Sequence, residues 1–587
     1  MSGIFAYTGS ELCRDLILKG LCLLESNGSA LCGFSEKGEN GISAYRLKGS
    51  PSQLITKTDK IKSEGYTGLS ECKNHFRSLE NPALVPAANE YISVASDGDI
   101  QNFEELKNQL PLNLFIKDDG ELILSLLLTR KEEGRIKQLK EVSDLLKGAP
   151  SLAVIHSDEE AIYCAAGEMP LYICMYESGV SVTNSISSVT DGVIRYQLLE
   201  KGEFARVTKE RAHIFDCRLK HIKKPFLSPP EDFVNNMNLL PSDGLYALPI
   251  ALKNTLSLLS NSSKITLGSY KLSRKLAERT QRIILAGSGC CYNAAAAGAY
   301  SLEQLTDIPC SAHISGELVL SPTVFDRETL LIILSDTPDD KDACACLNRA
   351  KEFGAKVIAV TDLPHSYLSK CADGVISLNE SFSAGKSRFS AFISFTLTLS
   401  LIALKLGYMR EIINSVYYNV ALKMSEMLAG KVSASIKPSP LLTAFSRSLI
   451  TGGRVVFTGL CADRTIAKEA AEIFRDTAGI NAFHLSLAEL ENKDSEYLKS
   501  SKIIAVITDK EYAYKTLKTA GQLAASGIDI TIVAGESIAQ ELFEAKNVLT
   551  YPDSLPLFNR ICAAATLYNA AVTALSLTGE GKEQKAV

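Results

Sequence analysis

The sequence predicts an α/β protein in which an N-terminal α+β domain precedes two doubly wound domains with parallel sheets. Three observations support this prediction. The chain has 587 residues, too many for one core, because domains usually hold about 100 to 200 residues. Strand-like runs follow one another between residues 90 and 216, whereas beyond residue 245 β-branched runs alternate with long helical stretches. The C-terminal half also repeats itself.

The N-terminal part is predicted to be a mostly antiparallel sheet with helices over 11–26 and 121–132. Its domain spans residues 1–218. Four prolines and no sustained periodicity mark a linker over 219–244, which ends this domain.

The repeat concerns three consecutive strands of the C-terminal half. Arg282-Ile-Ile-Leu-Ala-Gly is echoed 172 residues later by Arg454-Val-Val-Phe-Thr-Gly, and the strands near Ser335 and Gly354 recur 173 residues later. Strands in register at nearly one offset predict two copies of one α/β domain. We place these copies at 245–430 and 431–575, followed by a short tail over 576–587.

Composition excludes several classes of function. A net charge of -5 offers no broad basic field, so we expect no nucleic-acid partner. Fifteen cysteines without a CxxC pair, and only seven histidines, predict reduced thiols in a cytosolic chain with no metal and no cofactor. The N-terminus has no signal-peptide pattern. The most apolar run, 389–404, predicts a buried helix, so we expect no membrane partner.

Two loops of the first copy are candidate ligand loops. Gly287-Ser288-Gly289-Cys290-Cys291 follows the first strand, and Ser335-Asp336-Thr337 follows the second. In an open parallel sheet such loops meet at the carboxyl edge, where helix N-termini present free N–H groups to anions. A phosphate is therefore one interpretation. The alternative is that the glycines serve backbone geometry alone.

The order of several motifs resembles the glutamine-fructose-6-phosphate aminotransferase (isomerising) family over nearly the whole chain. The segments that carry the resemblance are the start Met-Ser-Gly-Ile, Gly65-Tyr-Thr-Gly-Leu, Asp97-Gly98-Asp99-Ile-Gln-Asn102, Asp119-Gly-Glu121 and Tyr246-Ala-Leu-Pro249. The resemblance implies an N-terminal glutaminase-like domain of the N-terminal-nucleophile class and two sugar isomerase (SIS) domains. It also implies a homodimer.

In the glutaminase half, the resemblance implies Ser2 as nucleophile where the family has cysteine. The family's glutamine-gripping arginine and tryptophan fall on Ser70 and Glu71, and its oxyanion-hole asparagine falls on Asp97, beside the retained Gly98. A carboxylate cannot donate a hydrogen bond to a developing oxyanion. Asp119 persists as an anchor for a substrate ammonium.

In the isomerase half, the resemblance places Cys290 and Cys291 where the family has hydroxyl ligands of a phosphate, and carboxylates in the loop 335–340. The catalytic glutamate falls on Asp476, and the ring-opening histidine on Asn492, which does not titrate. Lys386 and Arg388 bring two cations nearby. The remaining substrate-binding positions implied by the resemblance are Ser288, Ser335, Asp336, Thr337, Asp340, Ser387 and Glu469.

Three functions stay open. In the first, the chain is a divergent relative with lost or impaired glutaminase and isomerase activity that binds a carbohydrate derivative or a partner enzyme. In the second, it transfers the amide nitrogen of glutamine to fructose 6-phosphate, with Ser2 as nucleophile and Asp476 as base. In the third, the isomerase half acts on a less anionic sugar derivative. The expected ligands are a phosphosugar or other carbohydrate derivative and glutamine.

Overall fold

The structure, a computed structural model, describes residues 2–24, 31–59, 61–73, 84–110, 116–130, 134–167, 170–185, 188, 192–227, 241–261, 264–268, 270–337, 340–361, 366–378, 388–451, 453–493, 498–540 and 547–578. Met1, Lys386, Ser387, residues 228–240 of the predicted linker and residues 579–587 of the predicted tail lie outside this set. The chain forms two compact units, Met1–Asn236 and Met237–Val587.

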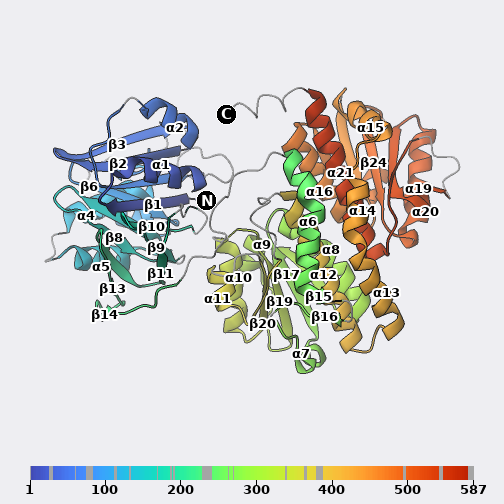
Figure 1. The fold of residues 1–587 in the computed structure, drawn as a ribbon, viewed down its shortest axis with the longest axis horizontal. Helices are drawn as coiled ribbons and strands as arrows, with labels where there is room; N and C mark the ends of the chain where they lie inside the picture. The colour runs from blue at the N-terminus through green and yellow to red at the C-terminus, as the bar shows by residue number, and fades with distance from the viewer. Residues whose placement is uncertain are drawn as a thin grey trace. The chain divides into compact units, whose positions relative to one another are not determined.

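The N-terminal unit contains two antiparallel sheets that face each other (Figure 1). The first has the order β11-β9-β10-β1-β4-β2-β3, and the second β14-β13-β12-β8-β7-β6-β5. The strands of the first sheet are β1 (Ser2–Gly9), β2 (Leu31–Gly38), β3 (Gly41–Lys48), β4 (Thr67–Lys73), β9 (Leu171–Met175), β10 (Gly179–Thr183) and β11 (Arg195–Leu199). Those of the second are β5 (Ala87–Ala88), β6 (Ile92–Asp97), β7 (Ser151–His156), β8 (Ile162–Ala165), β12 (Phe204–Val207), β13 (Ala212–Phe215) and β14 (His221–Ile222).

Helices cover the outer face of each sheet. On the first sheet lie α1 (Cys13–Leu24) and α2 (Pro51–Thr58), and on the second α4 (Asp119–Thr129) and α5 (Arg135–Leu145), with α3 (Phe103–Lys107) against α4. Strand β1 shows why the layers form, because its side chains alternate between two faces. Ile4 and Ala6 join the core between the sheets, whereas Phe5 and Tyr7 pack with residues of α1.

The C-terminal unit contains two five-stranded parallel sheets of the same topology. Their orders are β18-β17-β19-β20-β21 and β23-β22-β24-β25-β26. The first sheet consists of β17 (Arg282–Gly287), β18 (Cys310–Ile314), β19 (Thr329–Leu334), β20 (Lys356–Val360) and β21 (Gly374–Ile376). The second consists of β22 (Arg454–Thr458), β23 (Ala482–His484), β24 (Ser501–Ile507), β25 (Asp529–Gly535) and β26 (Val548–Tyr551). A short hairpin joins β15 (Ser260–Asn261) to β16 (Lys264–Ile265).

The three repeated sequence segments form β17, β19 and β20 in one sheet and β22, β24 and β25 in the other. The predicted fold class is therefore confirmed: antiparallel sheets in the N-terminal part and two doubly wound parallel sheets in the C-terminal part. Two structural elements lie at or beyond the predicted domain boundaries. Strand β14 extends the N-terminal sheet beyond residue 218, and the boundary at 430/431 falls inside α14 (Leu428–Ser435).

Four helices pack against one another between the two parallel sheets (Figure 1): α8 (Cys290–Thr306), α12 (Arg388–Met409), α16 (Asp463–Ala478) and α21 (Pro556–Thr578). Their apolar side chains belong to one continuous core that includes both sheets. The other helices are α6 (Pro241–Leu259), α7 (Arg274–Arg279), α9 (Ser315–Leu320), α10 (Lys341–Glu352), α11 (Tyr367–Cys371), α13 (Ser415–Glu426), α15 (Pro440–Ile450), α17 (Leu487–Glu491), α19 (Lys510–Ala525) and α20 (Glu536–Gln540).

Helices α12 and α21 are long and apolar enough to cross a membrane by length and composition, and among the described residues no other helix is. Both are core helices. The most apolar 18-residue window is 94% buried in α12 and 72% buried in α21. The predicted buried helix over 389–404 is confirmed as part of α12.

Candidate functional site

The expected nucleophile, Ser2, is the first residue of β1 and pairs in register with Lys73, the last residue of β4. Lys73 belongs to a cluster of buried charges. Its Nζ lies 3.1 Å from Oε1 of Glu71 and 3.7 Å from Oδ2 of Asp118, and it donates to Oγ of Ser96 at 3.3 Å. Of these residues, only Glu71 was predicted from the sequence, as a replaced tryptophan; no sequence pattern indicated Lys73 or Asp118.

Burial governs the electrostatics of this cluster. Glu71 is fully buried, and burial raises its pKa to about 7 although Lys73 lowers it. Burial lowers the pKa of Lys73, but Glu71 and Asp118 raise it more, so the ammonium form is stabilised. Oε1 of Glu71 accepts from the backbone N–H of Ser96, whereas Oε2 has no hydrogen-bond partner among the described residues.

Asp97 ends β6 and is buried, with 3% of its surface exposed. Its Oδ2 accepts a hydrogen bond from Nδ2 of Asn184 at 2.8 Å. Gly98 follows with a φ of +120°, and a Cβ there would lie 3.0 Å from Cα of Pro150. The structure therefore places the side-chain amide of Asn184 beside Asp97, which the sequence did not indicate. This amide donates its hydrogen bond to the carboxylate of Asp97.

Two other predicted positions of this half have structural partners. The hydroxyl of the buried Ser70 donates to the carbonyl oxygens of Phe5 and Ile17, at 3.3 and 3.2 Å, toward α1. Asp119 lies in the first turn of α4, is 7% exposed, and accepts from the backbone N–H of Ile100 at 3.4 Å.

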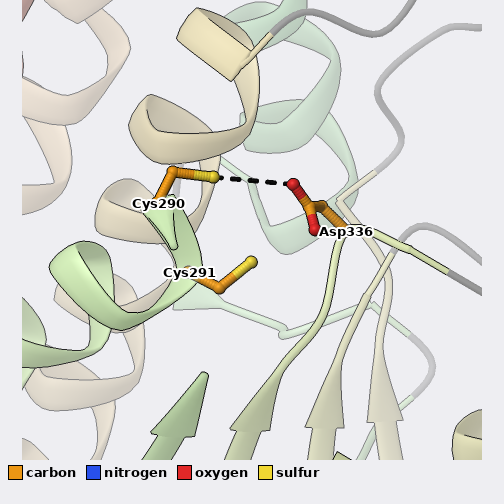
Figure 2. Close-up of side chains that lie close together, drawn as sticks. All are labelled: Cys290, Cys291 and Asp336. Atoms are coloured by element: carbon orange, nitrogen blue, oxygen red, sulfur yellow. Dashed lines mark hydrogen bonds between the residues drawn. The ribbon is translucent and has the colours of Figure 1, made fainter. Parts of the chain in front are cut away.

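In the C-terminal unit, the two candidate loops meet at the carboxyl edge of the first parallel sheet. Cys290 and Cys291 open α8, and Asp336 follows β19; their side chains point toward one another (Figure 2). Sγ of Cys290 donates to Oδ2 of Asp336 at 3.5 Å, and the three ligand atoms lie within 4.8 Å of one another. The thiol of Cys291 lowers the pKa of Cys290, but burial and Asp336 carry it to about 11.

The glycines of this loop have a role in backbone geometry, whether or not the loop binds a ligand. A Cβ at Gly287 would lie 2.7 Å from the carbonyl carbon of Cys291, and one at the equivalent Gly459 would lie 2.6 Å from that of Asp463. Gly289 has a φ of +56°. In both repeats, the end of the strand thus lies so close to the start of the following helix that only glycine fits there.

The other predicted ligand residues of the two loops, where described, make local contacts within the chain or are half-buried. The hydroxyl of buried Ser335 donates to the carbonyl oxygen of Thr337 at 2.8 Å. Asp340 caps α10, because its side chain accepts from the N–H of Ala343 at 2.9 Å. Burial raises the pKa of Asp340 to about 6. Ser288, expected beside the ligand, is half-buried.

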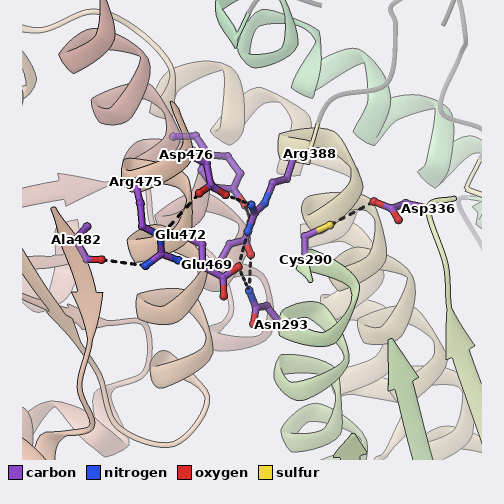
Figure 3. Close-up of polar contacts among 10 residues, drawn as sticks. Cys290, Asn293, Asp336, Arg388, Glu469, Glu472, Arg475, Asp476 and Ala482 are labelled. Atoms are coloured by element: carbon purple, nitrogen blue, oxygen red, sulfur yellow. Dashed lines mark hydrogen bonds and ion pairs between the residues drawn. The ribbon is translucent and has the colours of Figure 1, made fainter. Parts of the chain in front are cut away.

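Arg388 is the first residue of α12 and makes ion pairs with three acidic residues of α16 (Figure 3). Its guanidinium lies 3.5 Å from Oε1 of Glu469 and 2.5 Å from carboxylate oxygens of both Glu472 and Asp476. Burial lowers the pKa of Arg388, but these carboxylates raise it above its ordinary value. Arg388, one of the two cations expected near the ligand loops, is thus paired with carboxylates.

Glu469 is fully buried, and burial raises its pKa although Arg388 and Asn293 lower it. Nδ2 of Asn293 donates to Glu469 at 2.7 Å and to Glu472 at 3.1 Å, and the hydroxyl of Tyr568 donates to Glu469 at 3.3 Å. Sequence reasoning missed Asn293, Glu472 and Tyr568. Of these three, only Glu472 had a signal in the sequence: it lies three residues after Glu469, so both side chains are on one face of a helix.

The two expected catalytic positions of this half differ in surroundings. Asp476 is half-exposed and bound to Arg388. Asn492 is the C-cap of α17, is exposed, and donates from Nδ2 to the carbonyl oxygen of Ala488 at 2.9 Å. The structure therefore brings Glu469 and Asp476 together around Arg388, and it gives Asn492 a local helix contact.

The comparisons with known proteins agree with this architecture. Residues 275–407 match the SIS domain family. The glutamine–fructose-6-phosphate aminotransferase [isomerizing] of Clostridium perfringens is 23% identical over 590 residues, which cover 97% of this chain and 95% of that protein. The protein of the same name from Thermus thermophilus is 22% identical over 600 residues, covering 100% of this chain and 98% of that protein.

Among solved structures, the C-terminal domain of glucosamine-fructose-6-phosphate aminotransferase from Francisella tularensis matches with a TM-score of 0.53 and 20% identity. It covers 57% of this chain and 95% of that chain. This likeness shows the fold of the C-terminal unit.

Proposed function

We propose that this chain, a divergent relative of the glutamine–fructose-6-phosphate aminotransferases, binds a carbohydrate derivative of low negative charge in its C-terminal unit. We propose further that it does not move the amide nitrogen of glutamine to a sugar. The observation that carries this proposal is that Arg388 forms ion pairs with three carboxylates. In addition, the carboxylate of Asp336 lies beside the thiols of Cys290 and Cys291. A cation that is already matched by carboxylates gives little net attraction to a phosphate.

The N-terminal unit supports the absence of glutaminase chemistry. An amidase of the N-terminal-nucleophile class needs a base near its nucleophile and donors directed at the developing oxyanion. The carboxylate of Asp97 accepts a hydrogen bond from Nδ2 of Asn184 and has no N–H to donate to an oxyanion. Near the start of β1, the space between the sheets holds the Glu71–Lys73 ion pair.

The C-terminal unit supports the absence of isomerisation. A proton transfer between sugar carbons requires a base whose lone pair is free to accept. The carboxylate of Asp476 is held by Arg388, and the side chain of Asn492 does not titrate. The SIS domain over 275–407 still provides the loops and helix N-termini with which such domains hold a ligand.

Activity assays on the full-length protein test the catalytic part. We expect no release of ammonia from glutamine above that of Ser2→Ala, and no glucosamine 6-phosphate from glutamine and fructose 6-phosphate. Activity that Ser2→Ala abolishes would show that the second candidate is correct: an active transferase with Ser2 as nucleophile and Asp476 as base. The coverage of its relatives over nearly their full length favours that candidate.

A thermal-shift comparison tests the ligand part, because a ligand of the folded state raises the melting temperature. We expect glucosamine or fructose to raise it more than their 6-phosphates. Asp340→Asn is a matched variant, since asparagine caps a helix as well as aspartate but carries no charge. It should shift the preference toward the phosphorylated sugars. A wild-type preference for fructose 6-phosphate would contradict the proposal.

A further inference from the structure

The side chains of Cys290, Cys291 and Asp336 form the one group of three metal-ligating side chains that the described residues bring together. Two segments far apart in sequence supply them: the first turn of α8 and the loop after β19 (Figure 2). The thiols are buried, with 6% and 1% of their residues exposed, and Asp336 is half-buried. The sequence contains neither a CxxC pair nor a histidine cluster, so no metal was expected from it.

One distance in this group equals the distance expected around a tetrahedral zinc ion. With bonds of about 2.3 Å to sulfur and about 2.0 Å to a carboxylate oxygen, the sulfur and oxygen of a tetrahedral site lie about 3.5 Å apart. Sγ of Cys290 and Oδ2 of Asp336 lie 3.5 Å apart. All three ligand atoms lie within 4.8 Å of one another.

We propose that Cys290, Cys291 and Asp336 bind one Zn²⁺ ion. Two thiolates and one carboxylate suit this borderline-soft cation, and three protein ligands leave a fourth position open for water or a ligand oxygen. Binding of the ion releases the two thiol protons to solvent, and the N-terminus of α8, a helix of 17 residues, favours the negative charge of the thiolates that then bind the ion. These three residues also belong to the proposed sugar site, but the metal proposal rests on their own geometry and its test needs no sugar.

Cobalt titration of the metal-free, reduced, full-length protein tests the proposal, since Co²⁺ takes the same ligands and reports them by absorbance. We expect one equivalent per chain with the intense visible bands of a four-coordinate ion and a thiolate charge-transfer band. One equivalent of Zn²⁺ should abolish both. The double variant Cys290→Ser/Cys291→Ser should lose this equivalent.

Two further variants make the test decisive. Cys344→Ser/Cys346→Ser removes the same number of buried thiols from α10, which packs against β19 and β20, and should keep the cobalt spectrum. Asp336→Asn is isosteric and should keep the fold while weakening cobalt affinity at least tenfold. Wild-type protein without these bands, or equal binding by the Cys290→Ser/Cys291→Ser variant, would overturn the proposal. If that variant fails to fold, unchanged affinity in Asp336→Asn overturns it instead.

Discussion

Asn184 ties Asp97 to the first strand of the protein. Its Nδ2 donates to Oδ2 of Asp97 at 2.8 Å, and its Oδ1 accepts from the backbone N–H of Ile4 at 2.8 Å. All three residues are buried. One side chain therefore links β6 of the second sheet to β1 of the first, two residues from the expected nucleophile, Ser2.

Asn184→Ala removes a donor to one buried group and the acceptor of another. We expect the free energy of unfolding to fall by about 1 to 3 kcal/mol, because buried polar groups lose their partner. Denaturant titration measures the loss, and hydrogen exchange should localise it to β1 and β6. Asn492→Ala, at an exposed asparagine, is the control and should change stability by less than about 0.5 kcal/mol. Equal effects of the two variants would show that the link between the sheets contributes nothing.

The fold was accessible from sequence where a pattern is local or repeated. The segments that became β17 and β22 are runs of buried β-branched and aliphatic residues, and their common offset required no knowledge of packing. By contrast, β1 and β4 escaped prediction. Their polar residues, such as Ser70 and Glu71, are buried between layers that only the tertiary fold creates.

The candidate site was only partly accessible. Sequence placed Cys290 and Asp336 on loops that meet, because strand ends of a parallel sheet share one edge. It did not predict that Asp340 caps α10 or that Asn184 binds Asp97. Side-chain partners 87 residues apart, as in the second case, depend on the register of two sheets. The sequence before folding contains no local signal of such a pairing.

Gly98→Ala should destabilise the N-terminal unit. The φ of +120° disfavours any side chain, and a Cβ would press against Cα of Pro150 at 3.0 Å. We expect a loss of about 1 to 3 kcal/mol in the free energy of unfolding. Gly521→Ala is the matched control: Gly521 lies inside α19, and a Cβ there meets nothing within 4 Å. It should stabilise the protein by up to about 1 kcal/mol, since alanine favours helix. If Gly98→Ala leaves the melting temperature unchanged or raises it, the assigned strain at Gly98 is wrong.

Asp463 should make stability depend on pH. It opens α16, is fully buried, and accepts hydrogen bonds from the N–H and hydroxyl of Thr508. Burial raises its pKa to about 7, although these hydrogen bonds and Arg560 lower it. The folded state therefore binds more protons than the unfolded state between about pH 4 and pH 7, and the free energy of unfolding falls as pH rises through this range.

Asp463→Asn should remove this contribution. Relative to wild type, we expect the variant to gain about 2 to 4 kcal/mol in stability between pH 4 and pH 8. Denaturant titrations at a series of pH values measure the difference. Asp529→Asn, at a half-exposed carboxylate of β25, is the control and should follow the wild-type curve. A constant difference between Asp463→Asn and wild type across this range would contradict the assignment.

Arg388→Met should be the most damaging of these changes, because it leaves the fully buried carboxylate of Glu469 without its guanidinium. Removing one partner of a buried ion pair costs about 3 to 5 kcal/mol. Adding Glu469→Gln should recover part of this loss, since the amide needs no counter-charge, and a double-mutant cycle should give a coupling of about 0.5 to 3 kcal/mol.

Arg475→Met, at a half-exposed arginine of the same helix α16, should cost less than about 1 kcal/mol. If Glu469→Gln and Arg388→Met instead add independently, the guanidinium acts only on the more exposed Glu472 and Asp476. Those two carboxylates would still match the charge of the guanidinium, so only the buried ion pair between Arg388 and Glu469 would be contradicted.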